Sequence, residues 1–313
     1  MKHIWVVTDG KPGHQNQSLG LVDALAAQGV AVQMHLVPAV SGFNAGAALI
    51  TGAVRTLFGD LPTAHPDLII TTGHRTHLTA LALKRHFSAP LVVLMKPSLP
   101  LAWFDLCLIP HHDEPAQQDN IVATYGALNR MVGVSRDQKV GKPMLLLGGE
   151  SKHTQWDEQA VIDQVKTVCA AYPQVLATTS RRTPSSTVNA LEALALDNLE
   201  LVPFEQTDAN WLKERLPLAP VAWVTIDSVS MIYEALTAQC EVGVIELAPL
   251  LKGGKLKGAK QTPSRVIEGV QLLFKQELAT PFSEFSRTGS LVASEQTFNE
   301  AARCAEIVKE RFL

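Results

Sequence analysis

Cysteine is scarce in this chain, which has four such residues among 313. Cys107, Cys169, Cys240 and Cys304 lie far apart, and no C-x-x-C pair occurs. This pattern argues against a disulfide framework and against a zinc site built on clustered thiolates. The four thiols are typical of a protein that resides in a reducing compartment.

Long uninterrupted apolar runs are also missing. No stretch reaches the roughly 18 apolar residues that a membrane-spanning helix requires. The apolar run within MKHIWVVTDG at the N-terminus is too short for a signal peptide and continues into a strand-like segment. The sequence therefore predicts a cytoplasmic protein, and it leaves open a peripheral position at the inner face of the membrane.

Neither sign of charge dominates. The chain has 27 basic and 30 acidic residues and a net charge of −3, which argues against a protein that binds nucleic acid through bulk charge. Hydrophobic residues make up 46% of the chain and charged residues 18%, so the chain can bury sizeable cores. Its length suggests two domains of ordinary size.

Several catalytic motifs are absent as well. The sequence has no Walker A loop, no G-x-G-x-x-G, no H-E-x-x-H and no G-x-S-x-G. His74 and His77 in GHRTH and the segment HHDE at 111–114 contain possible metal ligands, but no Cys or carboxylate spacing supports a zinc site. We expect no metal site and no required cofactor, and a Ser-His-Asp hydrolase is disfavoured.

Short apolar runs that alternate with helical patterns are what the sequence does contain. Continuous apolar runs of this kind are typical of parallel strands covered on both faces. The sequence therefore predicts an α/β fold, with two Rossmann-like doubly wound parallel-sheet domains facing a cleft. The expected strands lie at 3–9, 31–37, 67–73, 91–96, 106–110, 143–149, 174–180, 199–205, 221–227 and 242–247.

The domain boundary is expected near 133–143, a polar, glycine-containing stretch before a new strand. This gives an N-terminal domain at 1–140 and a C-terminal domain at 141–313. The final segment, 294–313, reads as a helix that can pack back on the N-terminal domain. The segment 40–60 suggests a helix with an unusually apolar face.

Ligands of open parallel sheets bind beyond the carboxyl ends of the strands, where helix N-termini favour anions. Polar residues that directly follow a strand are therefore the site candidates. In the first half these are Asp9, Gly10, Lys11, Gly13, His14, Asn16, Gln17, Gly73, Arg75 and Thr76. The alternative is an ordinary strand-to-helix turn in which Asn16 caps the helix.

The second half offers a set of loops suited to an anion, because arginine recognises phosphate through paired hydrogen bonds. Its candidates are Gly149, Ser151, Lys152, Ser180, Arg181, Arg182, Thr183, Phe204, Asp227, Ser228, Ser230, Met231 and Glu234. Alternatives remain for each loop. The arginines can be solvated or paired with surface acids, Phe204 can be a core residue, and Asp227 with Ser228 can form an ordinary helix cap. The basic, glycine-rich segment 251–265 is either a mobile lid or a solvated loop.

The arrangement is similar to the GT-B glycosyltransferases, in which the C-terminal half holds the nucleotide-sugar and the N-terminal half the acceptor. DGKPGH also resembles the first loop of the lipid II-forming N-acetylglucosaminyltransferase. Four segments, TDGKPGHQNQSLGL, GGESKH, TSRRTP and TIDSVSMIYEA, resemble the bacterial and plant family named after the mitochondrial-fission "elongated mitochondria" protein. The resemblance spans nearly the whole chain. It implies a GT-B-like fold, and plant members are associated with recruiting a dynamin-related GTPase to the mitochondrial surface. Where that family has Gly-Arg-Arg-Thr, this chain has Gly73-His74-Arg75-Thr76.

Together these features suggest a glycosyltransferase that uses a nucleotide-diphosphate-sugar and an unknown acceptor. Arg181, Arg182, Ser228 and Ser230 would neutralise the diphosphate in place of a metal. The segment 9–17 would face the acceptor. Within it His14 would be the general base, because histidine ordinarily titrates near neutral pH, and Lys11 with Asn16 would position the acceptor or the β-phosphate. Glu234 would bind ribose.

Two alternatives stay open. One is a non-catalytic GT-B-like scaffold or regulator that recruits a protein partner at a membrane surface, which exposed apolar residues in 45–58 would favour. The other is a sugar-nucleotide epimerase. The sequence does not identify the sugar, the base, the acceptor, the stereochemistry of transfer or the oligomeric state.

Overall fold

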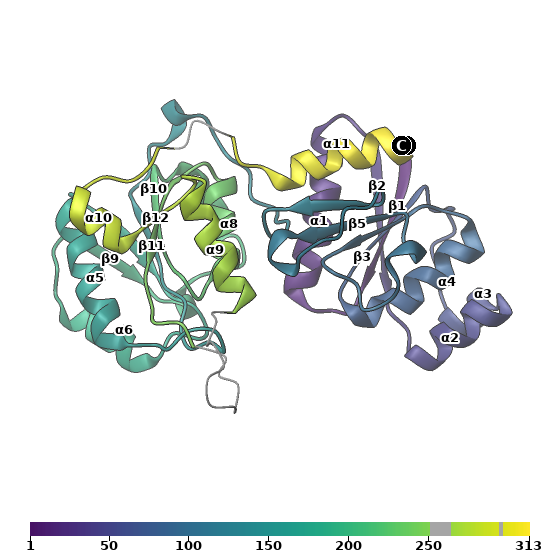
Figure 1. Cartoon of the computed structure of the whole chain (residues 1–313), viewed down its shortest axis with the longest axis horizontal. Helices are drawn as coiled ribbons and strands as arrows, with labels where there is room; N and C mark the ends of the chain where they lie inside the picture. The colour runs from purple at the N-terminus through teal and green to yellow at the C-terminus, as the bar shows by residue number, and fades with distance from the viewer. Residues whose placement is uncertain (251–263, 294–296) are drawn as a thin grey trace. The chain divides into compact units, whose positions relative to one another are not determined.

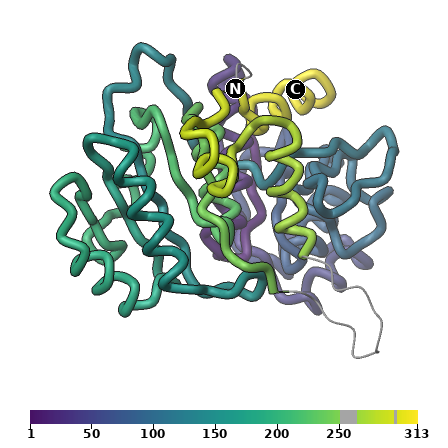
Figure 2. Tube along the Cα trace, turned by 60° about the vertical axis from the view of Figure 1, so that its left-hand side comes forward, coloured from purple at the N-terminus to yellow at the C-terminus, as the bar shows by residue number. Residues whose placement is uncertain are grey.

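The computed structural model describes residues 1–250, 264–293 and 297–313, and it contains two compact units (Figure 1). The first unit consists of Met1–Arg130 and Asn299–Leu313, and the second of Met131–Phe298. The chain thus enters the second unit, crosses it completely and returns to the first for its last helix. Both termini belong to the first unit and lie near each other (Figure 2).

The first unit is built on a six-stranded parallel sheet of order β2-β1-β3-β4-β5-β6. Its strands are β1 (Lys2–Thr8), β2 (Val32–Pro38), β3 (Leu68–Thr72), β4 (Leu91–Leu94), β5 (Leu106–Pro110) and β6 (Ile121–Thr124). Its helices are α1 (Pro12–Ala27), α2 (Gly42–Thr51), α3 (Val54–Phe58), α4 (His77–Phe87) and α11 (Glu300–Phe312), with short 3₁₀ turns η1 (His74–Thr76), η2 (Leu101–Trp103) and η3 (His111–Asp113).

Each face of this sheet is covered by helices, which is why its strands read as continuous apolar runs. Side chains alternate along a strand, so Trp5 and Val7 point to one face of β1 and Ile4 and Val6 to the other. The first face packs against α2 and α4. The second packs against α1 and against the apolar stripe of α11, whose members are Ala301, Cys304, Ala305 and Val308.

The second unit repeats the architecture with a parallel sheet of order β12-β11-β10-β7-β8-β9. Its strands are β7 (Met144–Leu146), β8 (Val175–Thr178), β9 (Leu199–Val202), β10 (Val221–Thr225), β11 (Glu241–Ile245) and β12 (Thr280–Pro281). Its helices are α5 (Glu158–Ala171), α6 (Ser185–Ala193), α7 (Trp211–Arg215), α8 (Val229–Thr237), α9 (Arg265–Lys275) and α10 (Phe282–Thr288), with 3₁₀ turns η4 (Arg136–Gln138), η5 (Phe204–Gln206) and η6 (Leu216–Leu218).

Ten observed strands match the ten expected from the sequence. The other two, β6 and β12, are edge strands of four and two residues. β12 contains a proline, and β6 is only partly buried, so neither shows the continuous apolar run that marks a central strand. The predicted fold class of two Rossmann-like parallel-sheet domains is confirmed.

The expected helix in 40–60 is wrong in its continuity, because the segment forms two short helices. α2 ends at Gly52, whose φ of 76° is the left-handed conformation that glycine adopts without steric cost. The second unit also begins at Met131 rather than at 141. The reason is that the segment before β7 is bound to that unit: Lys139 donates hydrogen bonds to the carbonyl oxygens of Pro217, Ala219 and Ala238.

Candidate functional site

The turn between β1 and α1 places a buried carboxylate beside a histidine. Both carboxylate oxygens of Asp9 lie 3.1 Å from Nδ1 of His14, and the backbone N–H of Lys11 donates to Oδ1 at 3.2 Å. The Asp9 side chain is 1% exposed, whereas that of His14 is 27% exposed. Burial by itself would raise the pKa of Asp9, but the hydrogen bonds and charges of His14 and Lys11 hold that pKa below its ordinary value.

A carboxylate can only accept hydrogen bonds, so the Nδ1 atom of His14 carries the proton in this pair. The other ring nitrogen, Nε2, is then an acceptor when the imidazole is neutral. Lys11 adds a positive charge nearby, with its Nζ 3.9 Å from Asp9. The turn therefore contains an oriented base on the partly exposed His14 ring.

Gly73 provides the surface against which His14 rests. β1 pairs with β3, so the residue that follows β3 lies next to the turn that follows β1. Gly73 has a φ of 93°, and a Cβ atom at this position would overlap the imidazole of His14. Both the conformation and the close approach therefore require glycine.

The other candidates of the first unit differ in how far they are buried. Thr76 is buried and donates a hydrogen bond to the Gly73 carbonyl at 2.7 Å, which holds the turn, while Arg75 is exposed. Gly10 and Gly13 are exposed, Asn16 is half-buried, and the Oε1 atom of Gln17 is buried without a hydrogen-bond partner.

Asn16 does not cap α1, which contradicts the alternative interpretation of this turn. Lys11 occupies the N-cap position and makes no side-chain cap, and Pro12 opens the helix. Because proline has no N–H and a favourable φ, it suits this first position. The backbone amides at the start of α1 thus have no capping side chain.

His77 has a different character from His14. It is buried at the start of α4 and packs edge-on against Phe104. Burial lowers the pKa of His77 to about 4, and the nearby His74 and His14 act in the same direction. His77 is therefore a neutral core residue at physiological pH.

In the second unit, three loops meet at a buried aspartate. They follow β7, β8 and β10, which are neighbours in the sheet, and we call them together the three-loop site (148–152, 180–183 and 227–231). The Oδ2 atom of Asp227 accepts from the Gly149 N–H at 2.9 Å and lies 2.8 Å from Nη2 of Arg182. Ser228 Oγ also donates to it, at 3.2 Å.

Arg182 is used to hold these loops together. Its Nη1 atom donates to the carbonyl oxygens of Gly149 at 3.2 Å and Glu150 at 2.9 Å, and its Nη2 atom donates to Ser228 at 3.0 Å. These bonds, together with the pair to Asp227, engage both terminal nitrogens of the guanidinium. The structure thus gives Arg182 a positioning role within the protein.

The glycine pair allows the loops to approach this closely. A Cβ atom on Gly148 would overlap the side chains of Asp227 and Ser228, and one on Gly149 would overlap the backbone of Arg182. The N–H of Gly148 donates to the hydroxyl of Thr225 at 2.7 Å. The sequence drew attention to the segments GGESKH and TIDSVSMIYEA, but Gly148 and Thr225 within them were not named as site residues.

Ser180 and Thr183 close the second loop internally. Thr183 Oγ1 accepts from the Ser180 N–H at 2.9 Å and hydrogen-bonds to the Gly148 carbonyl, while Ser180 Oγ accepts from the Arg182 N–H at 3.1 Å. Ser151 likewise accepts from the N–H groups of residues 153 and 154 in its own turn. These hydroxyl groups stabilise the backbone conformation of their own loops. Lys152, in contrast, is exposed.

Arg181 and Phe204 form a surface pair beside these loops. The Arg181 guanidinium lies 5.6 Å from the centre of the Phe204 ring, a cation–π contact. Phe204 is 37% exposed, so its interpretation as a core residue is wrong. A planar cation on an accessible ring is a surface on which a flat ligand group can stack.

The start of α8 has no side-chain cap. Ser228 is the N-cap residue but makes no capping hydrogen bond, so the first N–H groups of α8 have no side-chain partner. The Oδ1 atom of Asp227 is buried without a hydrogen-bond partner. Ser230 is exposed in the first turn and Met231 is half-buried. The interpretation of Ser228 as an ordinary side-chain cap is therefore wrong.

Glu234 lies further along α8 in a low-dielectric environment. Burial raises its pKa to about 7, and the positive charge of Lys213 offsets part of this effect. A carboxyl group in this range can accept or donate a hydrogen bond near neutral pH.

In the described ranges, no group of three or more His, Cys, Asp or Glu side chains is placed to hold a metal ion. The segment 251–265, interpreted as either a mobile lid or a solvated loop, falls largely on 251–263, which lies outside the described residues. None of the helices in 1–250, 264–293 or 297–313 is both long and apolar enough to cross a membrane.

Comparisons with known proteins bear on this geometry. A family model described as "Mitochondrial fission ELM1" matches residues 12–312. The "Uncharacterized protein RP120" of Rickettsia prowazekii is 30% identical over 114 residues, which cover 36% of this chain and 32% of that protein. The match therefore spans about a third of the length of that relative.

Solved structures of other proteins are similar to this chain. A putative UDP-N-acetylglucosamine 2-epimerase from Listeria monocytogenes has a TM-score of 0.54 and 12% identity, covering 100% of this chain and 97% of that one. An E. coli ADP-heptose lps heptosyltransferase II has a TM-score of 0.48 and 13% identity, covering 89% and 100%. At 12% identity the Listeria likeness shows a shared fold, which agrees with the GT-B-like architecture.

Proposed function

The chain belongs to the mitochondrial fission ELM1 family, and from that premise we propose that it is a glycosyltransferase that uses a nucleotide-diphosphate-sugar. The observation that carries the proposal is the Asp9–His14 pair. A buried carboxylate holds the imidazole through Nδ1 and leaves Nε2 as an acceptor on the partly exposed side. An oriented base of this kind suits the activation of a hydroxyl group.

In the proposed reaction, His14 Nε2 removes the proton from the acceptor hydroxyl. The hydroxyl oxygen forms the new bond to the anomeric carbon of the sugar, and the bond from that carbon to the diphosphate oxygen breaks. The nucleoside diphosphate leaves with the electron pair. Asp9 stays ionised and stabilises the imidazolium that forms, because its low pKa keeps it charged.

We assign the donor to the three-loop site. The uncapped start of α8, together with Ser230 and Arg181, would stabilise the charge on the leaving diphosphate. The buried Oδ1 atom of Asp227 would accept a hydrogen bond from a ligand hydroxyl, which is otherwise missing. Glu234 would contact ribose, and the exposed Phe204 ring would stack on the base.

This assignment differs from the sequence hypothesis in one respect. Arg182 and Ser228 were expected to contact diphosphate directly, but both are hydrogen-bonded within the loops. We propose that they hold the loops in place and that Arg181 is the arginine that contacts the donor.

A thermal-shift screen against UDP, GDP, CDP, ADP and their common sugar conjugates tests donor binding. We expect one nucleotide to raise the melting temperature, since a ligand that binds only the folded state stabilises it. Arg181→Ala should lose that shift, and the exposed Arg287→Gln should keep it as a matched control. No shift at millimolar concentrations of any of these ligands would overturn the donor assignment.

Product analysis separates the possible reactions. Incubation with the identified donor alone should release nucleoside diphosphate slowly, and addition of an acceptor extract should accelerate release and give a glycosylated product. His14→Ala should keep the thermal shift and lose the acceleration. If the donor is instead isomerised with no acceptor present, the protein is an epimerase.

A second candidate function is that of a scaffold at a membrane surface. On α2, Phe43 is 85% exposed and Ile50 is 79% exposed, and their spacing of seven residues places them on one side of the helix. No acidic residue occurs between Asp23 and Asp60, whereas Arg55 follows in α3. An apolar face without negative charge favours contact with an anionic lipid surface.

Co-sedimentation with vesicles tests this candidate. Vesicles that contain anionic lipid should retain the protein, and the double variant Phe43→Ser/Ile50→Ser should stay in the supernatant. Vesicles of neutral lipid are the control for the electrostatic part. Equal sedimentation of the parent and the double variant would remove α2 as the contact.

A further inference from the structure

A surface cavity of about 710 Å³ lies in the first unit, at the amino edge of its sheet. Pro90, which directly precedes β4, and Asp105, which directly precedes β5, are among its lining residues. The turn that contains Asp9 and His14 follows β1 and is therefore at the opposite, carboxyl edge. None of the residues assigned above to the acceptor or the donor lines this cavity.

Apolar side chains from several elements form the wall of the cavity. α2 contributes Leu49, α4 contributes Leu81 and α11 contributes Phe312. Trp103, in the turn η2, adds an indole ring that is 47% exposed. A cavity of this size with an apolar wall and a few polar groups is typical of small-molecule sites. The exposed indole is a flat surface on which another ring can stack.

Two of the charged side chains that line the cavity neutralise each other. The Nζ atom of Lys84 lies 2.8 Å from each carboxylate oxygen of Asp105, and it also donates to the carbonyl oxygen of Trp103 at 2.9 Å. The backbone N–H of Leu91 donates to the same carboxylate at 2.7 Å. Among the described lining residues, the net charge of the cavity therefore comes from Arg85.

Arg85 is exposed in the last turn of α4 and is only partly engaged. Its Nη1 atom donates at 2.7 Å to the carbonyl oxygen of Leu49, in the last turn of α2, where carbonyl groups lack a partner within the helix. Within the described ranges it forms no ion pair and no other hydrogen bond, which leaves Nε and Nη2 free. These two nitrogens form one edge of the guanidinium, and their parallel N–H bonds match the two oxygens of a carboxylate.

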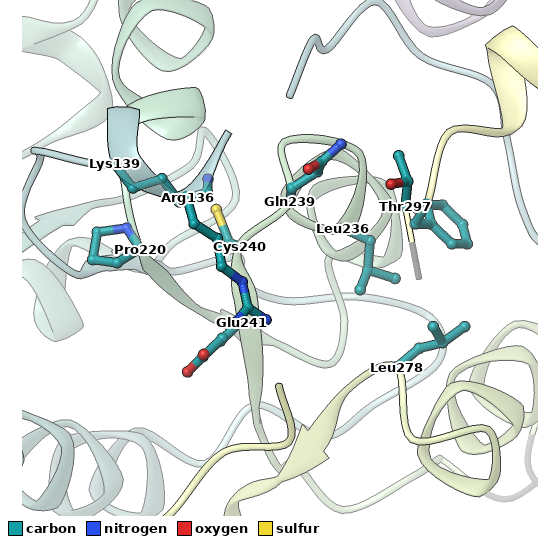
Figure 3. Close-up of a pocket in the computed structure, with 10 residues that line it drawn as sticks. Arg136, Lys139, Pro220, Leu236, Gln239, Cys240, Glu241, Leu278 and Thr297 are labelled. Carbon is teal, nitrogen blue, oxygen red and sulfur yellow. The ribbon is translucent and has the colours of Figure 1, made fainter. Parts of the chain in front are cut away.

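A cavity of about 510 Å³ in the second unit provides a contrast (Figure 3). Both segments that connect the two units line it, since Arg136 belongs to the segment that leaves the first unit and Thr297 to the segment that returns. Its cations are engaged: Lys139 donates to three carbonyl oxygens, and Arg136 also has a partner. Glu241 adds a negative charge to the same lining. The free edge of Arg85 has no counterpart among these residues.

We propose that the cavity of the first unit binds a small carboxylate with a flat apolar body. The carboxylate accepts one hydrogen bond from Nε and one from Nη2 of Arg85, and the flat body stacks on Trp103 beside Leu49 and Phe312. A monoanion fits the single uncompensated charge, whereas a phosphate group carries roughly two negative charges near neutral pH. The assignment is independent of the glycosyltransferase proposal, because no residue of 9–17 or of the three-loop site takes part.

Isothermal titration calorimetry with 2-naphthoate tests the site, because this probe joins a carboxylate to a flat apolar body. We expect saturable binding to the folded protein. The neutral analogue 2-naphthamide has nearly the same shape and should bind about tenfold more weakly, the loss expected for one charge-assisted hydrogen bond. Equal affinity for the two probes overturns the proposal, since the charge would then make no difference.

Variants of the exposed lining residues locate the binding. Arg85→Gln should weaken the binding of 2-naphthoate by about tenfold and leave that of 2-naphthamide nearly unchanged. Trp103→Ala should weaken the binding of both probes, because it removes the surface on which their rings stack. Both side chains are exposed, so we expect both variants to fold, which thermal unfolding checks. Arg136→Gln, in the lining of the second cavity, is the matched control and should bind 2-naphthoate as the parent does.

Hydrogen exchange gives an independent location. Bound 2-naphthoate should protect backbone amides in 84–91 and 101–105, which line the cavity of the first unit. No binding to the parent protein overturns the proposal, and so does unchanged binding in both Arg85→Gln and Trp103→Ala. A loss of binding in Arg136→Gln, or protection confined to the second unit, would place the probe in the other cavity and overturn it as well.

Discussion

Each unit places a buried aspartate directly beyond a central strand, and the two aspartates have different structural roles. Asp9 in the first unit is 1% exposed and Asp227 in the second is 0% exposed. Asp9 contacts one nitrogen of a histidine and leaves the other nitrogen available. Asp227 pairs with Arg182 and binds the Gly149 amide, so it connects three loops. The same placement thus orients an imidazole in one unit and fixes a backbone framework in the other.

The largest effect is expected from Gly149→Ala, which tests how tightly that framework is packed. The added methyl group would overlap the Arg182 backbone, which cannot move aside as a flexible side chain does. We expect a loss of about 3 kcal/mol in the free energy of unfolding, measured in urea. Gly13→Ala is the control, since a methyl group there meets open space and the residue is helical. A stable Gly149→Ala variant would contradict the close packing of the loops.

Asp9→Asn tests the orienting role in the first unit. Removal of the charge that stabilises the imidazolium should lower turnover about 100-fold with the donor identified above. The melting temperature should change little, because His14 is partly exposed to water and the amide oxygen of the introduced asparagine can still accept the hydrogen bond from Nδ1. A loss of stability without a loss of turnover would show that Asp9 acts as a framework residue like Asp227.

Asp227→Asn is the counterpart in the second unit. Breaking a buried ion pair leaves the partner charge uncompensated, and Arg182 is 43% exposed, so water reduces the cost. We expect a loss of about 2 kcal/mol in the free energy of unfolding and weaker nucleotide binding. Calorimetry and the thermal-shift screen measure the two effects. Full stability would indicate that the loops do not depend on this carboxylate.

Glu234→Gln should produce a pH-dependent gain in stability. Burial raises the pKa of Glu234 from its ordinary value near 4.5 to about 7, so the folded state binds the proton more tightly than the unfolded state. The carboxylate therefore destabilises the fold progressively as the pH rises from 4.5 to 7, and fully above that range. At pH 8 the variant should be about 3 kcal/mol more stable than the parent, since each pKa unit corresponds to about 1.4 kcal/mol, and at pH 4 equal to it.

Urea unfolding at both pH values measures the difference, with the exposed Glu214→Gln as the control. Identical curves for Glu234→Gln and its parent at pH 8 would contradict a raised pKa at this position.

The smallest effect on stability is expected from Arg181→Ala. The guanidinium lies on an exposed ring, so its removal should leave the free energy of unfolding within about 0.5 kcal/mol of the parent value. Nucleotide affinity should fall by about tenfold, the value of one charge-assisted hydrogen bond. Isothermal titration calorimetry measures the affinity. If Arg182→Ala leaves stability unchanged and only lowers affinity, the two arginines have been assigned to the wrong roles.

Much of the fold could be predicted, because most of its strands are visible in the sequence as short apolar runs. β3 and β5 are buried along their whole length, and a strand covered on both faces has to be apolar at every position. The partly buried edge strands β2 and β9 were predicted, whereas the edge strands β6, with four residues, and β12, with two residues of which one is a proline, were missed. The break at Gly52 was also hidden, because glycine is tolerated inside helices as well as at their ends.

The candidate site was predictable in location and less so in role. Polar residues after strands drew attention to Asp9, His14 and Arg182, because the carboxyl edge of a parallel sheet collects them. Arg182 and Arg181 are adjacent in the sequence and chemically identical. Only the distances to Asp227 and Phe204 show that one arginine holds loops and the other stacks on a ring.

The sequence by itself determined the local properties of this protein: the alternation of strands and helices, the glycines at turns and the positions of charged residues at strand ends. These follow from short-range sterics and from the apolar pattern of each segment. Only the tertiary structure decided which ring nitrogen of His14 contacts Asp9 and which of Arg181 and Arg182 is hydrogen-bonded within the loops. It also decided where both segments that connect the two units line a cavity. Those outcomes depend on groups far apart in the chain, such as Arg136 and Leu278, whose proximity no local pattern encodes.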